Sequence, residues 1–334
     1  MAANLDETLG FAALAFTGPR SKIWHGAGQS VDAKVAELGR ALTIDEWSTL
    51  SGTSFTVEAR PLSYVGADGL LTEYPDRFAN VRTDTSAALG LVSNRYNLVQ
   101  PLDVQSTFAD IIAADERFAI TTMGSLDGGK RIFAQATFAG EQSVAGDKHV
   151  AKLLMSTTFD TTSPTRLQGC MERVVCENTI RVAMGEHAPI INVRHSTKFD
   201  SDKALKALAD IAAGFAAFKV IGDALASHVM SVNTVSAFIR GVLDIPADAK
   251  QEDVSTRKQN QRQAIINALL ISSNERAQDY TAPDAFTALQ AITRYVDHDR
   301  DAGNTENRLF GSGAALKDKA LGLLMPMIKD RVAA

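Results

Sequence analysis

The sequence has few cysteines, no excess of positive charge and no long apolar run. Two cysteines occur among 334 residues, Cys170 and Cys176, and their spacing matches neither a zinc knuckle nor a redox C-x-x-C pair. Two small buried side chains are expected instead. The formal net charge of −5 excludes a histone-like protein that binds nucleic acid over its whole surface, but not a local basic groove.

No apolar run approaches the roughly 20 residues that span a bilayer. The first residues, MAANLDETLGFAALAF, place acidic side chains before the apolar stretch and lack the cationic start of a signal peptide. The sequence therefore predicts a cytoplasmic protein without membrane contact. Because 45% of the residues are hydrophobic, the chain can bury a substantial core, in one large domain or two smaller ones.

Short β-type runs alternate with turn signals up to about residue 200. The runs between 53 and 160 predict an antiparallel sheet. Residues 30–52 predict two short helices, and 102–118 predict a third helix, whose apolar residues recur at helical spacing.

The stretch VRTDTSAALGLVSNRYNLVQ, residues 81–100, is typical of a hairpin, with Val81–Thr83 and Leu89–Val92 as its strands. It carries Arg82, Asp84 and Arg95 close to its apolar positions. These charges indicate either the solvated face of a sheet or a surface that binds something.

The segment GSLDGGKR, residues 124–131, matches part of a phosphate-binding loop. Such a loop needs Ser or Thr where Arg131 stands, and it needs a helix to follow, whereas RIFAQATF reads as a strand. We therefore expect Gly128 and Gly129 to form the tip of a β-hairpin that does not bind nucleotide.

Beyond residue 200 the pattern becomes helical. Helices are predicted over residues 201–231, 252–273, 282–300 and 313–328, with breaks at Pro246 and Pro283. The predicted fold class is α+β: an antiparallel sheet with helices in the N-terminal two-thirds and a helical C-terminal region. Two domains are expected, 1–200 as a β-rich α+β core and 201–334 as a helical region packed on it.

The segment YVDHDRD, residues 295–301, is the densest cluster of metal-competent side chains. Asp297, His298 and Asp299 could ligate a hard cation in a metal-dependent nuclease. However, consecutive residues point around a helix rather than to one side. A charged helix end, with His298 near the C-terminal dipole, is the favoured interpretation, and no metal or other cofactor is expected.

Basic side chains are the more suggestive feature. Candidate nucleic-acid-binding residues are Lys130, Arg131, Arg166, Arg173 and Arg181, which we expect on one face, contacting phosphate. Arg173 follows Glu172 and could form a salt bridge instead. Exposed aromatic rings could stack on bases, but rings in β-type runs usually belong to the core. The rings concerned are those of Tyr96, Phe133 and Phe159.

Several motifs, in order from Trp24 to Leu321, carry a family resemblance. They include LTIDEWSTLSGTSFTVEARPL, VRTDTSAALGLVSNRYNLVQP, GSLDGGKRIFAQATF, LLMSTTFDTTSPTRLQG, RVVCENTI and RLFGSGAALKDKAL. Together they resemble the phage/plasmid-like protein family, domain of unknown function 932. The chain departs from that pattern at Thr161, where the family commonly has glycine, and at Glu177, which adds a negative charge.

The order of elements also resembles the core of single-strand annealing recombinases of the RecT/Redβ/Erf type. That resemblance implies a homo-oligomer that holds single-stranded DNA in a basic groove and anneals it without cofactor hydrolysis. The expected function is thus DNA binding in phage or plasmid recombination or replication, with phage or host replication proteins as possible partners. The alternatives are a non-enzymatic protein-interaction or host-takeover factor of a mobile element and, as a minor one, the nuclease.

Overall fold

The computed structural model describes residues 14–18, 28–173, 179–181, 191–193, 201–301 and 304–332. The chain forms two compact units that interleave along the sequence. Unit 1 comprises residues 1–139, 152–168 and 189–211, and unit 2 comprises residues 140–151, 169–188 and 212–334. The sequence analysis divides the chain once, at residue 200, which is where its secondary structure changes.

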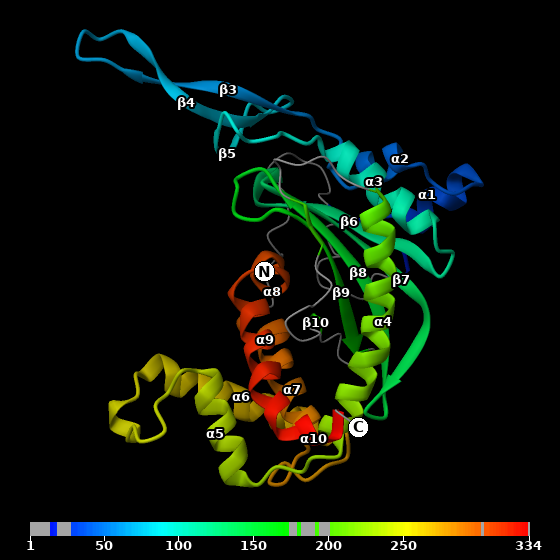
Figure 1. The fold of residues 1–334 in the computed structure, drawn as a ribbon, viewed down its shortest axis with the longest axis vertical. Helices are drawn as coiled ribbons and strands as arrows, with labels where there is room; N and C mark the ends of the chain where they lie inside the picture. The colour runs from blue at the N-terminus through cyan, green and yellow to red at the C-terminus, as the bar shows by residue number, and fades with distance from the viewer. Residues whose placement is uncertain are drawn as a thin grey trace. The chain divides into compact units, whose positions relative to one another are not determined.

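Strands dominate the first half of the chain, and they pair mainly antiparallel (Figure 1). A three-stranded sheet has the order β3 (Val57–Val65), β4 (Leu71–Arg82), β5 (Ala88–Ser93). A larger sheet has the order β10-β9-β8-β7-β6-β1-β2, and β11 also pairs with β9. Its strands are β1 (Leu14–Phe16), β2 (Gln29–Ser30), β6 (Phe118–Leu126), β7 (Arg131–Val144), β8 (Asp147–Thr158), β9 (Thr165–Arg173), β10 (Thr179–Arg181) and β11 (Ile191–Val193).

Three helices of unit 1 confirm the prediction and begin where the sequence provides caps. They are α1 (Val31–Leu38), α2 (Ile44–Leu50) and α3 (Pro101–Ala113). The Ser30 hydroxyl caps α1, and Thr43 with Glu46 forms a capping box at α2. Pro101 opens α3, where a missing backbone N–H costs nothing.

The predicted hairpin at residues 124–131 is confirmed. Leu126 in β6 pairs with Arg131 in β7, and the 3₁₀ turn Asp127–Gly129 connects them. Gly128 and Gly129 have φ values of 69° and 93°, the left-handed region that glycine enters without steric cost. That this turn binds no nucleotide stays a prediction.

The hairpin predicted within residues 81–100 is also present, but the side chain of Arg82 is buried, which neither interpretation of its charge expected. Val81 in β4 pairs with Ala88 in β5. Arg82 is 2% exposed, so it lines neither a solvated face nor a binding surface. Its guanidinium lies 4.0 Å from the Phe55 ring centroid, and Nη1 donates to the Gly128 carbonyl. Asp84 supplies the counter-charge at 2.8 Å.

The outer part of the β3–β4 ribbon, residues 62–76, is called the arm below. In Figure 1 it extends away from α1, α2 and α3 of the same unit. The strand register shifts between Pro61 and Ser63, because the β4 segment that includes Pro75 is longer than its counterpart. A proline has no N–H to donate, so a bulge is a position that tolerates it.

Helices dominate after residue 200, as predicted. The described α-helices are α4 (Ser201–Ala226), α5 (Val232–Val242), α6 (Thr256–Glu275), α7 (Ala285–Arg294), α8 (Thr305–Leu309), α9 (Ser312–Leu324) and α10 (Lys329–Val332). The sequence analysis missed α5, which Ser231 caps and whose buried side chains Val235, Phe238 and Val242 have helical spacing. Among the described residues, no helix combines the length and apolar character that a membrane crossing requires.

The aromatic rings considered for base stacking are mostly core residues. Phe159 is fully buried and packs with Phe55, Leu89 and Ile132, and Phe133 is 3% exposed. Cys170 is also buried, as predicted, whereas Cys176 lies outside the described residues. The Phe133 and Phe159 rings therefore stabilise the fold and are not accessible for stacking, whereas the Tyr96 ring is half-buried.

Candidate functional site

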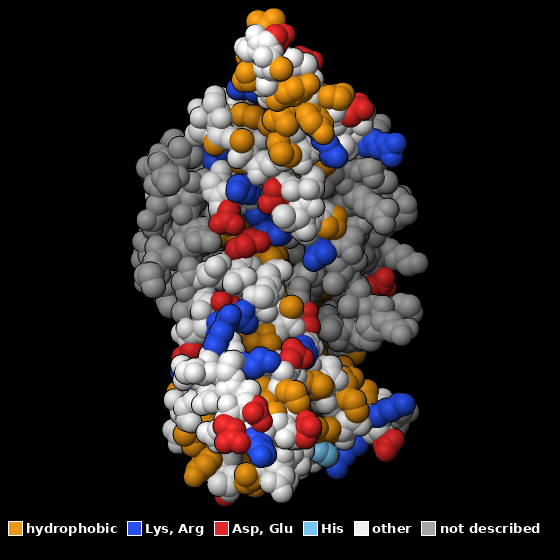
Figure 2. Space-filling model, turned by 90° about the vertical axis from the view of Figure 1, so that its left-hand side faces the viewer, with side chains coloured by type: hydrophobic (Ala, Val, Ile, Leu, Met, Phe, Trp, Pro, Cys, Tyr) orange, Lys and Arg blue, Asp and Glu red, His pale blue; other side chains and the backbone are white. Residues whose placement is uncertain are grey.

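The arm exposes large hydrophobic side chains on both sides of the ribbon. Figure 2 shows hydrophobic side chains gathered over this part of unit 1. The arm surface consists of five residues that are each 50% exposed or more: Tyr64, Val65, Leu70, Leu71 and Tyr74. Strand register places Val65 opposite Leu71, and the rings of Tyr64 and Tyr74 meet edge to face with centroids 6.4 Å apart.

The charged side chains on and beside the arm differ between its outer part and its base. Asp68 and Glu73 lie in its outer part, whereas Arg77 and Arg95 lie nearer its base, and all four are exposed. Glu73, Arg77 and Arg95 form no ion pair with any residue that the structure describes. Asp76 is also exposed at the base, where its carboxylate accepts a hydrogen bond from Asn94. The outer part of the arm is thus acidic, and its base carries two arginines and one carboxylate.

The predicted nucleic-acid-binding residues differ in exposure. Lys130 is exposed at the β6–β7 turn, Arg166 in β9 is half-buried, and Arg131 is 7% exposed. Arg181 lies in β10 opposite Cys170, and its side chain is outside the description. Whether these residues contact phosphate stays a prediction. Of the four whose side chains are described, Lys130 is the one that solvent reaches freely.

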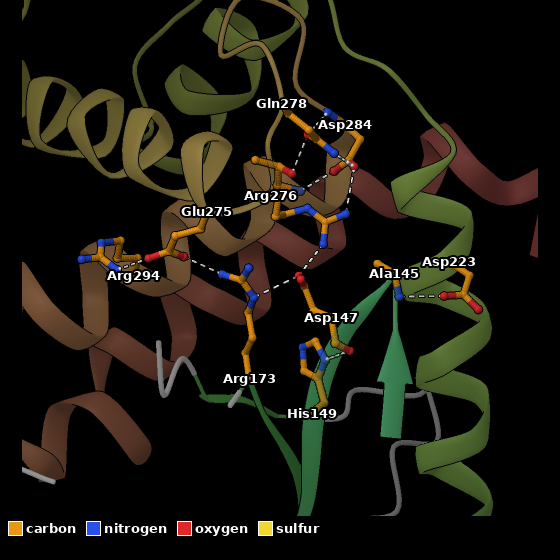
Figure 3. A network of polar contacts seen from close by, with 11 residues as sticks. Ala145, Asp147, His149, Arg173, Asp223, Glu275, Arg276, Gln278, Asp284 and Arg294 are labelled. Carbon is orange, nitrogen blue, oxygen red and sulfur yellow. Dashed lines mark hydrogen bonds and ion pairs between the residues drawn. The ribbon is translucent and has the colours of Figure 1, made fainter. Parts of the chain in front are cut away.

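Arg173 belongs to a buried network of arginines and carboxylates within unit 2 (Figure 3). It is 1% exposed, and it donates from Nε to Asp147 Oδ2 at 2.9 Å and from Nη1 to Glu275 Oε2 at 2.7 Å. Arg276 also donates to Asp147 and lies 3.2 Å from Asp284, while Arg294 binds Glu275. The salt bridge considered for Arg173 therefore exists, although with Asp147 and Glu275.

The network balances three guanidinium groups against three carboxylates. It ties the start of β8 and the end of β9 to the end of α6 and the start of α7. Buried ion pairs of this kind hold elements in one arrangement, since removing one partner leaves an uncompensated charge. The arrangement can fix a fold, but its guanidinium groups already have acceptors and so are not available to a ligand.

His149 lies beside this network and is 1% exposed. Its Nδ1 lies 3.1 Å from the Asp147 carbonyl oxygen, its Nε2 has no hydrogen-bond partner, and its ring packs edge to face on Phe286. Burial lowers the pKa of His149 below its usual value, and the positive charges of Arg173 and Arg276 act in the same direction. The folded protein therefore favours the neutral imidazole.

The segment considered for metal binding forms a π-helix, Tyr295–Arg300, after α7. Asp297 Oδ1 accepts a hydrogen bond from Lys317 Nζ at 2.8 Å, and both side chains are 2% exposed. Burial raises the pKa of the Asp301 carboxyl, which lies one turn later. The described residues contain no group of three or more His, Cys, Asp or Glu side chains positioned to hold a metal ion.

A cavity of about 450 Å³ lies between α5, α6 and the segment that connects them. Its lining combines two arginines, three glutamines and three aliphatic residues: Arg240, Ile245, Gln251, Val254, Gln259, Arg262, Gln263 and Ile266. The sequence analysis missed both this cavity and the arm surface. The sequence does contain a signal for the cavity, because the spacing of residues 259, 262, 263 and 266 places them on one face of a helix.

These features define an α+β protein with an exposed apolar arm and a polar cavity among its C-terminal helices. The chain matches the family described as Domain of unknown function (DUF932) over residues 88–317. This match covers more than half of the sequence, so the chain belongs to that family. No curated protein and no solved structure matches the chain.

Proposed function

We propose that the protein is a non-enzymatic interaction protein that associates with a second copy of itself through the arm. The apolar arm surface carries this proposal, because five large side chains there are half or more exposed. Extended apolar patches on soluble proteins mark interaction sites, and each partner in a stable interface contributes about 800 Å². Aromatic rings such as Tyr64 and Tyr74 are enriched in such interfaces.

Charge arrangement favours a second copy as the occupant. In a two-fold symmetric pair, the same surface meets itself, so residue i contacts j and residue j contacts i. Two arms laid antiparallel would bring the acidic outer part of each, with Glu73, against the base of the other, with Arg77 and Arg95. One apolar face of each arm would then be covered while opposite charges pair at the rim.

Sedimentation-velocity centrifugation of Val65→Asp and Val229→Asp tests this proposal. Val65 on the arm is 68% exposed and Val229 in unit 2 is 67% exposed, so the two changes are matched in type and accessibility. The wild-type chain and Val229→Asp should sediment as dimers at micromolar concentration, and Val65→Asp should raise the dissociation constant of the dimer at least tenfold. A wild-type chain that stays monomeric at 100 times that concentration would contradict the proposal.

A charge exchange distinguishes self-association from binding to another protein. Glu73→Arg and Arg77→Glu should each weaken association, because each places like charges together in the symmetric pair. The double variant restores the opposite signs and should recover most of the affinity. Failure of the double variant to recover, with both single variants folded, would indicate a different partner.

Single-stranded DNA binding in phage or plasmid DNA metabolism is the second candidate function. It is favoured by Lys130, an exposed cation of unit 1 that pairs with no acidic side chain in the described ranges and that the self-association proposed above does not use. An annealing protein must hold many nucleotides, so the self-association proposed above is also what annealing requires. Binding through phosphate leaves the bases free to find their complements.

Fluorescence anisotropy with labelled single-stranded DNA at two salt concentrations tests this second function. Each phosphate neutralised should contribute roughly −0.7 to the slope of log affinity against log salt. Lys130→Ala should flatten the slope by about that amount. Lys148→Ala is the control, because Lys148 is exposed but already paired with Glu141 at 2.8 Å. If the wild-type chain shows no detectable DNA binding at low salt, the second candidate function is excluded and self-association remains as the proposed function.

A further inference from the structure

The cavity between α5 and α6 has a lining that none of the functions above uses. Arg240 on α5 and Arg262 on α6 both reach it, and neither forms an ion pair with a carboxylate of the described chain. The connecting segment carries the exposed acids Asp244, Asp248, Glu252 and Asp253, of which Asp244 pairs with Lys319 and Glu252 lies beside Lys250. The two guanidinium groups therefore contribute positive charge that no carboxylate of the described chain pairs with directly.

The two arginines differ in how firmly they are held. Arg240 Nη2 donates to the carbonyls of Pro246 and Ala249, which fixes the connecting segment around it. Among the described residues, the guanidinium of Arg262 makes one hydrogen bond, 3.5 Å from Nη2 to the Ser236 hydroxyl, which is a long one. Arg262 is thus the residue that retains most of its donors for a ligand. A planar guanidinium with free donors matches phosphate or carboxylate oxygens.

The position of the cavity along α6 adds to the positive potential. α6 begins at Thr256 after the Ser255 cap, so Gln259 lies at the end of the first turn. The N-terminal end of a helix carries a partial positive charge from its aligned peptide dipoles. An anion in the cavity would interact favourably with this end and with both guanidinium groups.

Two of the three glutamines are oriented by contacts within the protein. Gln259 Nε2 donates to the carbonyls of Gln251 and Val254, and Gln263 Nε2 donates to Asn267 Oδ1. These bonds use the amide N–H groups and leave each Oε1 as an acceptor with no partner among the described residues. The cavity therefore offers acceptors, and it also offers an aliphatic wall formed by Ile245, Val254 and Ile266.

We propose that this cavity binds a nucleoside monophosphate whose base carries an exocyclic amino group. The phosphate binds Arg262 and Arg240, the amino group donates to the glutamine Oε1 atoms, and the flat base packs on the aliphatic wall. A volume of about 450 Å³ lies in the usual range for small-molecule sites. This site is independent of the self-association proposed above.

Isothermal titration calorimetry of the full chain with adenosine 5′-monophosphate tests the proposal. The wild-type chain should bind it, and adenosine without the phosphate should bind at least tenfold more weakly. Inosine 5′-monophosphate, which has a carbonyl in place of the amino group, should bind at least fivefold more weakly. Equal affinity for the nucleotide and for adenosine, or no binding at millimolar concentration, would overturn the proposal.

Two matched variants locate the site. Arg262→Gln should weaken binding of adenosine 5′-monophosphate at least tenfold, whereas Arg257→Gln, which removes an exposed charge from the same helix, should change it less than twofold. Circular dichroism melting checks that both variants fold. Equal losses in the two variants would mean general electrostatic attraction rather than a site, and would overturn the assignment.

A competition experiment distinguishes whether the cavity binds a free nucleotide or a nucleotide that is part of a DNA strand. A deoxyadenosine oligomer that displaces adenosine 5′-monophosphate from the wild-type chain identifies the occupant as part of a strand. Retention of the bound mononucleotide in excess oligomer identifies it as a free nucleotide. The shared chemistry, a phosphate with an amino-bearing base, is the same in both cases.

Discussion

Lys317 Nζ lies 2.8 Å from Asp297 Oδ1, and the two side chains form an ion pair that is almost completely removed from solvent. The pair connects the π-helix after α7 with α9. Asp297→Asn should lower the free energy of unfolding by about 3–5 kcal/mol, because the buried lysine loses the carboxylate that it contacts at 2.8 Å. Urea denaturation measures this loss.

The double variant Asp297→Leu/Lys317→Met is the control for this pair. Replacing both charges with apolar groups removes the unpaired charge, so the double variant should be much more stable than Asp297→Asn. If Asp297→Asn loses less than about 1 kcal/mol, the pair does not stabilise the fold as inferred.

The stability of the protein should decrease below pH 6.5 because of His149. Its pKa is lowered in the folded state, mainly by burial, so the unfolded chain binds the proton more readily. The contribution of His149 to stability is therefore fully present above the ordinary histidine pKa of 6.5, and it is lost as the pH falls towards the pKa of the folded state. His149→Phe should flatten this part of the curve of melting temperature against pH, and an unchanged slope would show that another group titrates.

Alanine substitutions at two glycines of α9 should change the stability of the protein in opposite directions. A Cβ on Gly313 would overlap Asp301 Oδ2 and lie 2.8 Å from Val296 Cγ1, so Gly313→Ala should cost about 1–3 kcal/mol. Gly322 has open space around it, and Gly322→Ala should stabilise the helix by about 0.5–1 kcal/mol. Thermal denaturation of both variants checks the signs, and a stabilising Gly313→Ala would contradict the packing described.

Replacing Thr161 with glycine should stabilise the folded protein. Its φ is 67°, a left-handed conformation that costs a side chain with a Cβ roughly 1–2 kcal/mol. Thr161→Gly should raise the free energy of unfolding by about 0.5–1 kcal/mol, after the entropy cost of glycine.

The neighbouring Thr162→Gly provides the control for Thr161. Thr162 donates from its backbone N–H to Asp160 Oδ1 at 3.0 Å and from its hydroxyl to the same oxygen. Loss of the hydroxyl should destabilise the turn, so the two substitutions should shift the melting temperature in opposite directions. A shift of both in the same direction would argue against strain at Thr161.

Local patterns predicted most of the secondary structure correctly. The capping residues Ser30 and Thr43 and the glycines of the 127–129 turn act within a few residues, so a sequence displays them directly. The short helix α5 was missed because the alanine-rich pattern before it extends to Ser231 without a glycine or proline to separate the two. Its own pattern of Val235, Phe238 and Val242 is nevertheless clear once Ser231 is recognised as a cap.

The functional residues were harder to predict because exposure depends on tertiary packing. Arg82, Arg131 and Arg173 are charged, yet each is less than a tenth exposed. Their partners include Asp84 for Arg82, and Asp147 and Glu275 for Arg173, and the latter two lie far away in sequence. Conversely, the apolar residues of the arm match an ordinary strand pattern, and only the fold leaves them uncovered.

The two prolines at the bulge limit how the arm can assemble. Pro61 lies in β3, an edge strand, and Pro75 lies in the outer part of β4, beyond the Arg77–Ser93 pair where the contact with β5 ends. Neither proline can donate a backbone hydrogen bond, so a neighbouring strand could not add along either edge of the ribbon without an interruption, which protects the arm against growth into an open-ended fibre. Association is therefore expected through a side-chain face, and the face that meets its own copy is then covered. The two prolines thus favour pairing through a face over growth by strand addition.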